Sequence, residues 1–317
     1  MKKTYQQSTS QTEISVVVPV FEEEQSLDEL VTGIEDALEE YAYEVILVDD
    51  GSQDGSWAEI KRLRENHAGI HGIRLQRNYG KSTALQSGFE SVQGRFVVTM
   101  DADLQDDPNE IPALVELLKE DYDLISGWKK KRFDPLSKTI PSRFFNRVTR
   151  WVTGIKLHDF NCGLKAYRRE VIDHIYLHGE LHRYVPLMAY WEGYHKIGEK
   201  EVRHHPRKYG KTKFGLSRFM HGFLDLLTLI FVNRYMNRPM HFFGTIGVLS
   251  LVLGGVINTY LAYVKLFHGE SLSNRPLLFL GVMLVVVGVQ FFSIGFLGDI
   301  MNRVQAKKNK PNIRDRI

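Results

Sequence analysis

The sequence predicts an α/β domain with a mostly parallel sheet, followed by two membrane-spanning helices. Short Val- and Ile-rich runs alternate with amphipathic stretches through the larger, N-terminal part of the 317-residue chain. This alternation is typical of parallel sheets with helices on both faces. Acidic residues directly follow two of the apolar runs, and two long apolar stretches occur near the C-terminal end.

The elements of the α/β part follow from residue spacing. Predicted strands are residues 14–20, 43–48, 72–75 and 95–100, and predicted helices are residues 26–41, 57–65 and 82–92. The first helix carries Leu27, Leu30, Ile34 and Leu38 at helical spacing on one face.

Charge and cysteine content restrict the class of protein. The 41 Lys and Arg residues nearly balance the 38 Asp and Glu residues, which leaves a formal net charge of +3. The single Cys162 excludes an internal disulfide and fits a reducing compartment. Residues 1–13 are polar and contain no apolar run, so we expect a disordered lead rather than a secretory signal.

Two stretches near the C-terminal end are apolar enough to cross a membrane. Residues 241–267 are dominated by apolar residues and Gly, and residues 276–298 contain no charge. A helix needs about 20 such residues to cross a bilayer. The alternative is a pair of buried core helices. Glycines in both stretches favour close helix packing, and we expect such anchors to associate as a homo-oligomer.

Flanking charge predicts the orientation of this anchor. Basic residues precede the first stretch and follow the second, whereas the connecting loop carries few charges. The positive-inside rule therefore places the α/β domain and both termini in the cytoplasm, with the chain as a multi-pass protein of the inner (plasma) membrane. Residues 214–237 mix large apolar and charged residues, which predicts an interfacial amphipathic helix, with a third span as the alternative.

These observations predict a domain order. We expect the disordered lead at residues 1–13, the α/β domain at 14–213, the interfacial helix at 214–237, the two-span anchor at 238–302 and a basic cytoplasmic tail at 303–317.

The acidic residues after two strands are the main chemical signal. Asp101 and Asp103 follow the strand at 95–100, and Asp50 follows the strand at 43–48. Ligands of α/β sheets bind at the carboxyl ends of the strands. Two carboxylates spaced by two residues suit Mg²⁺ or Mn²⁺ that also holds a diphosphate. One of the Asp49 and Asp50 carboxylates is a candidate acceptor of hydrogen bonds from a nucleobase or ribose, and a helix N-cap and turn is the alternative reading of this motif.

A basic segment lies inside the α/β part. Residues 129–150 hold eight Lys and Arg side chains against one acid, interleaved with aromatic and apolar residues. Beside a membrane anchor, this pattern favours anionic headgroups or a lipid phosphate over nucleic acid, so we expect no nucleic-acid partner. A solvated face without a ligand is the other alternative.

Five motifs together resemble a known family. VVVPVFEEEQSL, EVILVDDGSQDGS, RNYGKSTALQSGF, MDADLQDDP and DFNCGLKAYRRE occur in the order and spacing of GT-A glycosyltransferases of family 2. The closest similarity is to dolichol-phosphate mannose synthases and bacterial polyisoprenyl-phosphate hexosyltransferases. The resemblance covers nearly the whole chain. It implies a GT-A (Rossmann-like) catalytic domain.

The resemblance also implies roles for individual residues. Those implied to bind the nucleotide sugar are Pro19, Phe21, Glu23, Asp50, Arg77, Lys81, Asp101, Arg183, Arg207 and Lys213. Asp101, Asp103 and Gln105 are implied metal ligands; Lys129, Arg143 and Arg147 are implied to hold the acceptor phosphate; and Asp159, Asp103 and Arg143 are implied catalytic residues. Two positions depart from the family, with Glu22 where Asn is usual and Cys162 where Ser is usual.

The implied reaction is inverting transfer of a hexose to a polyisoprenyl phosphate such as undecaprenyl phosphate, for cell-envelope glycosylation. The resemblance to the bacterial hexosyltransferases favours UDP-glucose as the donor. A phosphate monoester has a second pKa of about 6, so the acceptor is already nucleophilic at pH 7 and needs no strong base. Two alternatives stay open. One is a family 2 enzyme acting on a glycan or lipid hydroxyl with Asp159 as base, and the other is a non-catalytic sugar-nucleotide-binding membrane protein.

Overall fold

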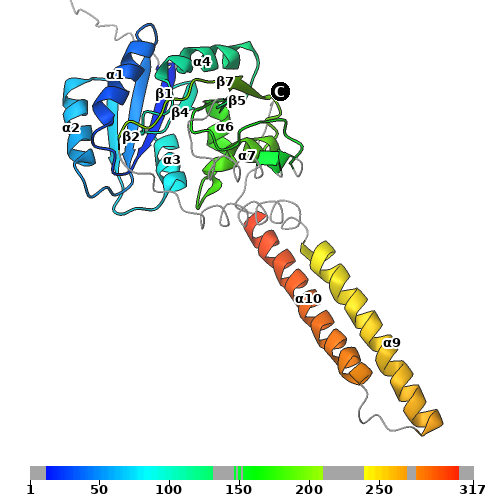
Figure 1. Ribbon diagram of the computed structural model, residues 1–317. Helices are drawn as coiled ribbons and strands as arrows, with labels where there is room; N and C mark the ends of the chain where they lie inside the picture. The colour runs from blue at the N-terminus through cyan, green and yellow to red at the C-terminus, as the bar shows by residue number, and fades with distance from the viewer. Residues whose placement is uncertain are drawn as a thin grey trace, which may run out of the picture. The chain divides into compact units, whose positions relative to one another are not determined.

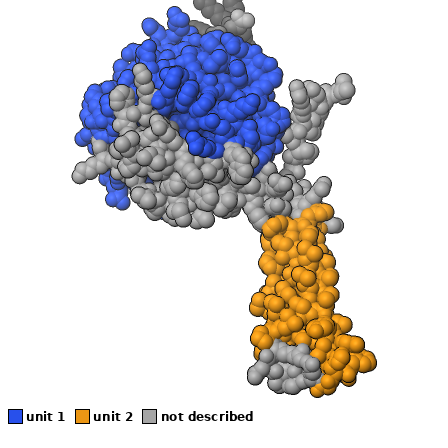
Figure 2. Space-filling model, turned by 45° about the vertical axis from the view of Figure 1, so that its right-hand side comes forward, with its two compact units in different colours: residues 1–225 blue, residues 226–317 orange. Residues whose placement is uncertain are grey.

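The computed structural model describes residues 12–130, 146–147, 149–150, 153–209, 239–269 and 276–306. The chain divides into two compact units, residues 1–225 and residues 226–317 (Figure 2). The segment predicted to be an interfacial helix, residues 214–237, lies outside the described residues, as do the predicted lead up to residue 11 and the tail from residue 307.

The first unit contains a seven-stranded sheet and the helices around it (Figure 1). The strands are β1 (Ile14–Val20), β2 (Tyr43–Asp49), β3 (Ile70–Arg74), β4 (Phe96–Thr99), β5 (Leu124–Trp128), β6 (Lys165–Arg168) and β7 (Ile197–Glu201). The helices are α1 (Leu27–Ala37), α2 (Ser56–Asn66), α3 (Lys81–Phe89), α4 (Ile111–Glu120), α6 (Arg169–His174) and α7 (Val185–Trp191), with short 3₁₀ turns η1 (Pro108–Glu110) and η2 (Leu181–Arg183).

The sheet is mostly parallel, as the sequence predicts. Its order is β3-β2-β1-β4-β6-β5-β7. Strands β1 to β4 run parallel, and so do β5 and β7, whereas β6 runs antiparallel to both of its neighbours. The parallel half brings the carboxyl ends of β1, β2 and β4 to one edge. This is the edge where α/β sheets bind ligands.

Helices cover both faces of the sheet, which explains the continuous apolar run of β1. Val16, Val18 and Val20 belong to one buried cluster with α1, α2 and α4. Val17 points to the opposite face because strand side chains alternate. There it meets α3, where a Cβ added to Gly88 would lie 2.3 Å from Val17 Cγ1. Gly88 thus lets α3 pack directly on the centre of the sheet.

The second unit is a helical hairpin. It consists of a π-helical turn η4 (Met240–Gly244) that leads into α9 (Thr245–His268), followed by α10 (Pro276–Ala306). Within the described residues, Met240–His268 and Pro276–Met301 are long and apolar enough to cross a membrane. Many of their large apolar side chains are exposed, with Leu266 and Phe279 each 77% accessible. Buried core helices would not leave these faces open, so the hairpin has the character of a membrane anchor.

Glycines form the contact between α9 and α10. A Cβ added to Gly247 would lie 2.8 Å from the carbonyl oxygen of Gly288, and one added to Gly254 would lie 2.7 Å from that of Gly281. Larger residues would push the two backbones apart. The close packing of membrane helices expected from the sequence is therefore present within the hairpin.

Replacing Gly254 with leucine is expected to lower the apparent unfolding temperature of the detergent-solubilised protein by about 5 °C, because overpacking forces the helices apart. The adjacent Gly255 provides a matched control, since a Cβ added there meets nothing within 4 Å. Thermal unfolding of the two variants, followed by size-exclusion chromatography after heating, checks the prediction. Equal unfolding temperatures for Gly254→Leu and Gly255→Leu would contradict it.

Candidate active site

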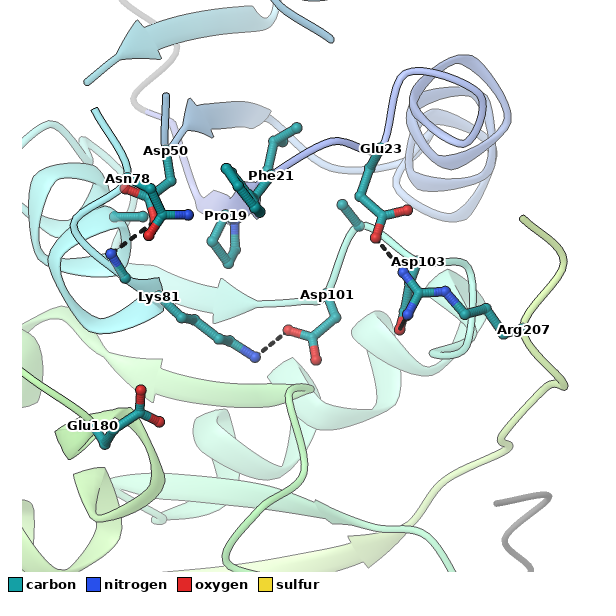
Figure 3. A pocket seen from close by; sticks show the side chains of 14 residues that line it. Pro19, Phe21, Glu23, Asp50, Asn78, Lys81, Asp101, Asp103, Glu180 and Arg207 are labelled. Atoms are coloured by element: carbon teal, nitrogen blue, oxygen red, sulfur yellow. Dashed lines mark hydrogen bonds and ion pairs between the residues drawn. The ribbon is translucent and has the colours of Figure 1, made fainter. Parts of the chain in front are cut away.

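A cavity of about 380 Å³ lies at the carboxyl ends of β1, β2 and β4 (Figure 3). Its lining includes eight residues that the sequence assigns to the site, namely Pro19, Phe21, Glu23, Asp50, Lys81, Asp101, Asp103 and Arg207. It also includes Asn78 and Glu180, which the sequence argument misses. Asn78 lies in the RNYGKS motif between two assigned residues, so its position was open to inference. Glu180 follows no motif and gives no local signal.

The turn after β4 directs two carboxylates into this cavity. Leu104 has a left-handed backbone with φ +58°, and Gln105 N donates to Asp103 Oδ1 at 3.2 Å. Gly163, from the DFNCG motif, lies against the other carboxylate, because a Cβ there would be 2.5 Å from Asp101 Oδ2. The glycine of that motif therefore makes room for Asp101, which links the fifth motif to the fourth.

Basic side chains surround Asp101. Lys81, at the start of α3, donates from Nζ to Asp101 Oδ1. Burial alone would raise the pKa of Asp101, but the charges of Lys81, Lys129 and Lys165 outweigh it and hold that pKa below its ordinary value. Asp101 is thus ionised at neutral pH. Lys165 is buried on β6, and its burial lowers its own pKa.

The pKa of Asp103 shifts in the opposite direction. Burial, followed by the nearby charges of Asp101 and Asp106, raises the pKa of Asp103 to about 6. Arg207 partly offsets this effect from 4.0 Å, and the same guanidinium donates to Glu23 Oε1. Figure 3 shows Arg207 between these two carboxylates. One cationic side chain therefore connects the loop after β1 with the turn after β4.

Backbone pairing holds the segment that carries Arg207. His205 N donates to Gln105 O at 2.8 Å, and Asp106 and His204 form an antiparallel bridge. The segment after β7 is thereby attached to the acidic turn itself. This backbone pairing places Arg207 at the cavity, although residue 207 is far in sequence from the acidic turn.

Asp50 fixes a neighbouring loop. Its two carboxylate oxygens accept from Tyr79 N at 2.8 Å and Gly80 N at 2.9 Å. Burial raises the pKa of Asp50, although these two amides act against the shift. Gly51 has φ +73°, and a Cβ on it would lie 2.4 Å from the backbone carbon of Arg77. Asp50 lines the cavity, but its carboxylate also organises the loop that leads into α3.

Some assigned residues do not line the cavity. Arg77 is exposed and stacks on Tyr79, with its guanidinium carbon 4.1 Å from the ring centroid. Gln105 contributes backbone hydrogen bonds to the acidic turn. Arg147 is exposed, whereas Arg143 and Lys213 lie outside the described residues. The roles implied for these residues stay predictions.

Asp159 and Cys162 are buried beside the site. Asp159 is 1% exposed, is absent from the cavity lining, and accepts from Asn161 N at 3.1 Å within its own turn. The structure therefore gives it a turn-stabilising contact, and its catalytic role stays a prediction. Burial raises the pKa of the Cys162 thiol to about 12. The thiol is neutral at physiological pH and unsuited to act as a nucleophile.

Lys129 forms a buried ion pair. Its Nζ lies 2.6 Å from Asp106 Oδ1, and its side chain is 12% exposed. Burial would lower the pKa of Lys129, but Asp106 and other nearby acidic groups raise it. This residue was expected to hold the acceptor phosphate on a basic surface. The structure pairs it with the buried Asp106, and its acceptor role stays a prediction.

The cavity fits a divalent cation that is shared with a substrate. Asp101 and Asp103 supply hard oxygen ligands, and within the described ranges no group of three or more His, Cys, Asp or Glu side chains is suited to a metal. Mg²⁺ is commonly held by one or two carboxylates together with substrate phosphates and water. This donor set therefore fits Mg²⁺ or Mn²⁺ with a diphosphate and does not fit a closed structural zinc site.

Glu22 has a strained backbone in the loop after β1. Its φ is +52°, which is unfavourable for most side chains but common for Asn. The usual Asn of the related motif thus has a conformational explanation. We expect Glu22→Asn to stabilise the protein by about 1 kcal/mol, measured by chemical unfolding of the purified protein. An unchanged or lower stability would mean that contacts of the Glu22 side chain outweigh the backbone strain.

Comparisons with known proteins agree with this geometry. Residues 15–176 match the family described as Glycosyl transferase family 2. The chain is 41% identical over 310 residues to a dodecaprenyl-phosphate galacturonate synthase of Rhizobium johnstonii, covering 95% of this chain and 91% of that protein. It is 34% identical over 295 residues to an undecaprenyl-phosphate 4-deoxy-4-formamido-L-arabinose transferase of Sodalis glossinidius, covering 92% and 89%.

A solved structure shares the fold. The glucosyl-3-phosphoglycerate synthase of Mycobacterium tuberculosis, in complex with Mn²⁺, UDP-glucose and phosphoglyceric acid, has a TM-score of 0.55 and 19% identity. The match covers 69% of this chain and 79% of that one. At this identity the similarity concerns the fold alone, and it confirms the predicted GT-A architecture.

Proposed function

Because this chain belongs to glycosyl transferase family 2, we propose that its donor is a UDP-sugar and that the sugar is glucose. The chain is an enzyme that transfers a sugar to a polyisoprenyl phosphate, as its relatives over more than nine tenths of its length do by name. The names of those relatives specify galacturonate and a formamido arabinose. The preference for UDP-glucose rests on the resemblance of the five motifs to bacterial hexosyltransferases.

One observation carries this proposal, the convergence of acidic and basic groups on a single cavity. Pro19, Phe21 and Asp50 line one side of it, where a nucleoside would lie (Figure 3). Asp101 and Asp103 reach the cavity from the turn after β4. A ligand with a flat, hydrogen-bonding base joined to a diphosphate matches this order of groups.

The chain's own cations complete the diphosphate site. Asp101 and Asp103 would hold Mg²⁺ or Mn²⁺, which would supply positive charge to stabilise the departing nucleotide. Lys81 and Arg207 lie against the same two carboxylates. Both side chains are flexible enough to move from a carboxylate to a phosphate oxygen and to neutralise charge as it develops.

The acceptor needs orientation more than activation. A phosphate monoester is mostly dianionic at neutral pH, so it attacks the anomeric carbon without a general base. Direct displacement with inversion follows. The hydroxyl-acceptor alternative requires a base near the sugar, and the buried Asp159 does not support that role.

The membrane anchor serves the same reaction. A polyisoprenyl chain stays in the bilayer and presents only its phosphate to the enzyme. We place the protein in the inner membrane as a multi-pass protein with its catalytic domain and both termini in the cytoplasm. Arg147, which is exposed, and Arg143 are candidates for contact with the acceptor phosphate, and Lys213 is a candidate for contact with the donor.

A donor screen with the purified full-length enzyme tests the proposal. Undecaprenyl phosphate is incubated with Mg²⁺ or Mn²⁺ and radiolabelled UDP-glucose, UDP-galacturonate or GDP-mannose, and label is measured in extracted lipid. Transfer from UDP-glucose with an inverted anomeric configuration is the expected result. Undecaprenol, which lacks the phosphate, is expected to accept no sugar.

Other outcomes would overturn parts of the proposal. Labelled undecaprenol would favour the hydroxyl acceptor, and a retained configuration would exclude direct displacement. Label from another donor alone would replace the glucose assignment and keep the reaction class. Glu59→Gln is a control for the loss of a carboxylate outside the cavity, because Glu59 pairs with Arg62 on α2, and it is expected to transfer sugar as the parent does.

A further inference from the structure

Glu180 occupies a distinct wall of the cavity. Among the carboxylates that line it in the described part of the chain, Glu23, Asp50, Asp101 and Asp103 come from the loops after β1, β2 and β4. Glu180 alone comes from after β6, immediately before η2. In the view of Figure 3, the Lys81 side chain runs between Asp50 and Glu180 toward Asp101. Because Glu180 lines the same cavity as Asp50 and Asp101, it is a candidate for contact with the sugar of a donor bound there.

The segment that carries Glu180 is attached to the helix that carries Lys81. His182 N donates to Ser82 Oγ at 3.0 Å, and Leu177 N donates to Gln86 Oε1 at 2.9 Å. Both acceptors are on α3, and Ser82 follows Lys81 directly. The position of Glu180 is therefore fixed relative to the lysine that faces Asp101.

A partly buried arginine contacts the Glu180 carboxylate. Arg183 Nη2 lies 3.3 Å from Glu180 Oε2, and the side chains are 14% and 28% exposed. A carboxylate held in this way can accept two hydrogen bonds from neighbouring hydroxyl groups of a sugar. Its negative charge would repel a sugar carboxylate at the same place.

We propose that Glu180 recognises the donor sugar, an inference that rests on the proposed function. Its carboxylate accepts hydrogen bonds from the hydroxyl groups of the sugar and selects an uncharged hexose over a uronic acid. The paired Arg183 positions this carboxylate. The relatives include proteins named for an acidic and for an uncharged sugar, so this selection is a meaningful choice within the family.

The test compares donors in the full-length enzyme and in Glu180→Gln, with undecaprenyl phosphate as acceptor. The parent is expected to use UDP-glucose in preference to UDP-galacturonate. The variant is expected to lose about 10- to 100-fold in kcat/KM for UDP-glucose, as for a lost hydrogen bond to a charged group. The ratio of kcat/KM for UDP-galacturonate over UDP-glucose is expected to rise by at least the same factor.

Binding of UDP separates a specificity role from a structural one. UDP lacks the sugar, so its affinity is expected to be equal in the parent, in Glu180→Gln and in the surface control Glu59→Gln. Glu180→Asp keeps the charge on a shorter side chain. This variant is expected to have a lower kcat/KM for UDP-glucose and still to exclude UDP-galacturonate.

The outcomes distinguish the two levels of the argument. Suppose that the parent transfers glucose from UDP-glucose and that Glu180→Gln leaves the ratio of kcat/KM values for the two donors unchanged. The role of Glu180 would then be overturned, and the proposed function would stay intact. The same conclusion would follow if Glu180→Gln weakened UDP binding by the same factor as it lowered kcat/KM for UDP-glucose. A parent that prefers UDP-galacturonate would overturn the selection for an uncharged sugar. A parent that uses no UDP-sugar would remove the proposed donor and this inference with it.

Discussion

Replacement of Asp103 with asparagine is expected to abolish transfer and, at the same time, to stabilise the protein measured without metal or donor. The pKa of Asp103 is raised to about 6 by burial and by the charges of Asp101 and Asp106. Ionisation of this group at pH 7.5 therefore costs stability, and the amide avoids the cost. We expect a gain of roughly 2 kcal/mol and a fall in turnover of at least about 100-fold.

The sign of this effect depends on pH in a defined way. Because the folded pKa of Asp103 lies above its ordinary value of 3.8, the stability cost is fully present above pH 6 and fades as the pH falls toward 4. Unfolding measurements from pH 4 to pH 8 should show Asp103→Asn and the parent converging in acid. A variant that is less stable than the parent at pH 7.5 would contradict the prediction.

Asp107 offers a matched control with the opposite sign. Burial would raise the pKa of Asp107, but hydrogen bonds from Asn109 and His205 lower it below its ordinary value. The charged form of Asp107 therefore stabilises the fold, and Asp107→Asn is expected to be less stable than the parent at neutral pH. Two acid-to-amide changes four residues apart would thus shift stability in opposite directions.

Replacement of Lys129 with methionine is expected to destabilise the catalytic domain by about 3–5 kcal/mol, because it leaves a buried carboxylate unpaired. The partner is Asp106, which is 2% exposed and lies 2.6 Å from the ammonium group. Chemical unfolding of the purified protein measures the change. The double variant with Asp106→Asn is expected to recover most of the loss, because neither charge is then buried alone.

This cycle also decides between two roles for Lys129. The family resemblance implies that Lys129 holds the acceptor phosphate, and the structure shows Lys129 paired with the buried Asp106. If Lys129→Met folded with the stability of the parent and raised only the KM for undecaprenyl phosphate, the acceptor role would be correct and the structural one wrong.

Local sequence patterns were sufficient for the parallel half of the sheet. The strand predicted at residues 14–20 has those bounds in the structure, and the next three strands and three helices occur in the predicted order. Each is a short apolar or amphipathic segment, and the spacing of its apolar residues indicates whether it forms a strand or a helix and which face is buried. The antiparallel direction of β6 was not predictable, because strand direction depends on the partner strand and leaves no mark on the apolar pattern.

The same distinction explains the site. Asp101 and Asp103 were identifiable because the end of a strand brings them to the binding edge. Glu180 was missed because its position depends on a hydrogen bond between residues 100 positions apart in sequence, from His182 to Ser82. The acceptor role of Lys129 is implied by the family resemblance and stays a prediction, and the position of a residue in a motif does not show that it pairs with a buried acid.

The glycine contacts between α9 and α10 have a consequence for how the anchor can diverge. The close contact between the two helices confines positions 247 and 254 to glycine, the smallest residue, whereas outward positions such as Leu266 and Phe279 are exposed. Natural variation should therefore accumulate on the lipid side and spare the inner line. Bilayers of different thickness or composition could then be accommodated by exchanging the outer residues, without any change in how the two helices hold together.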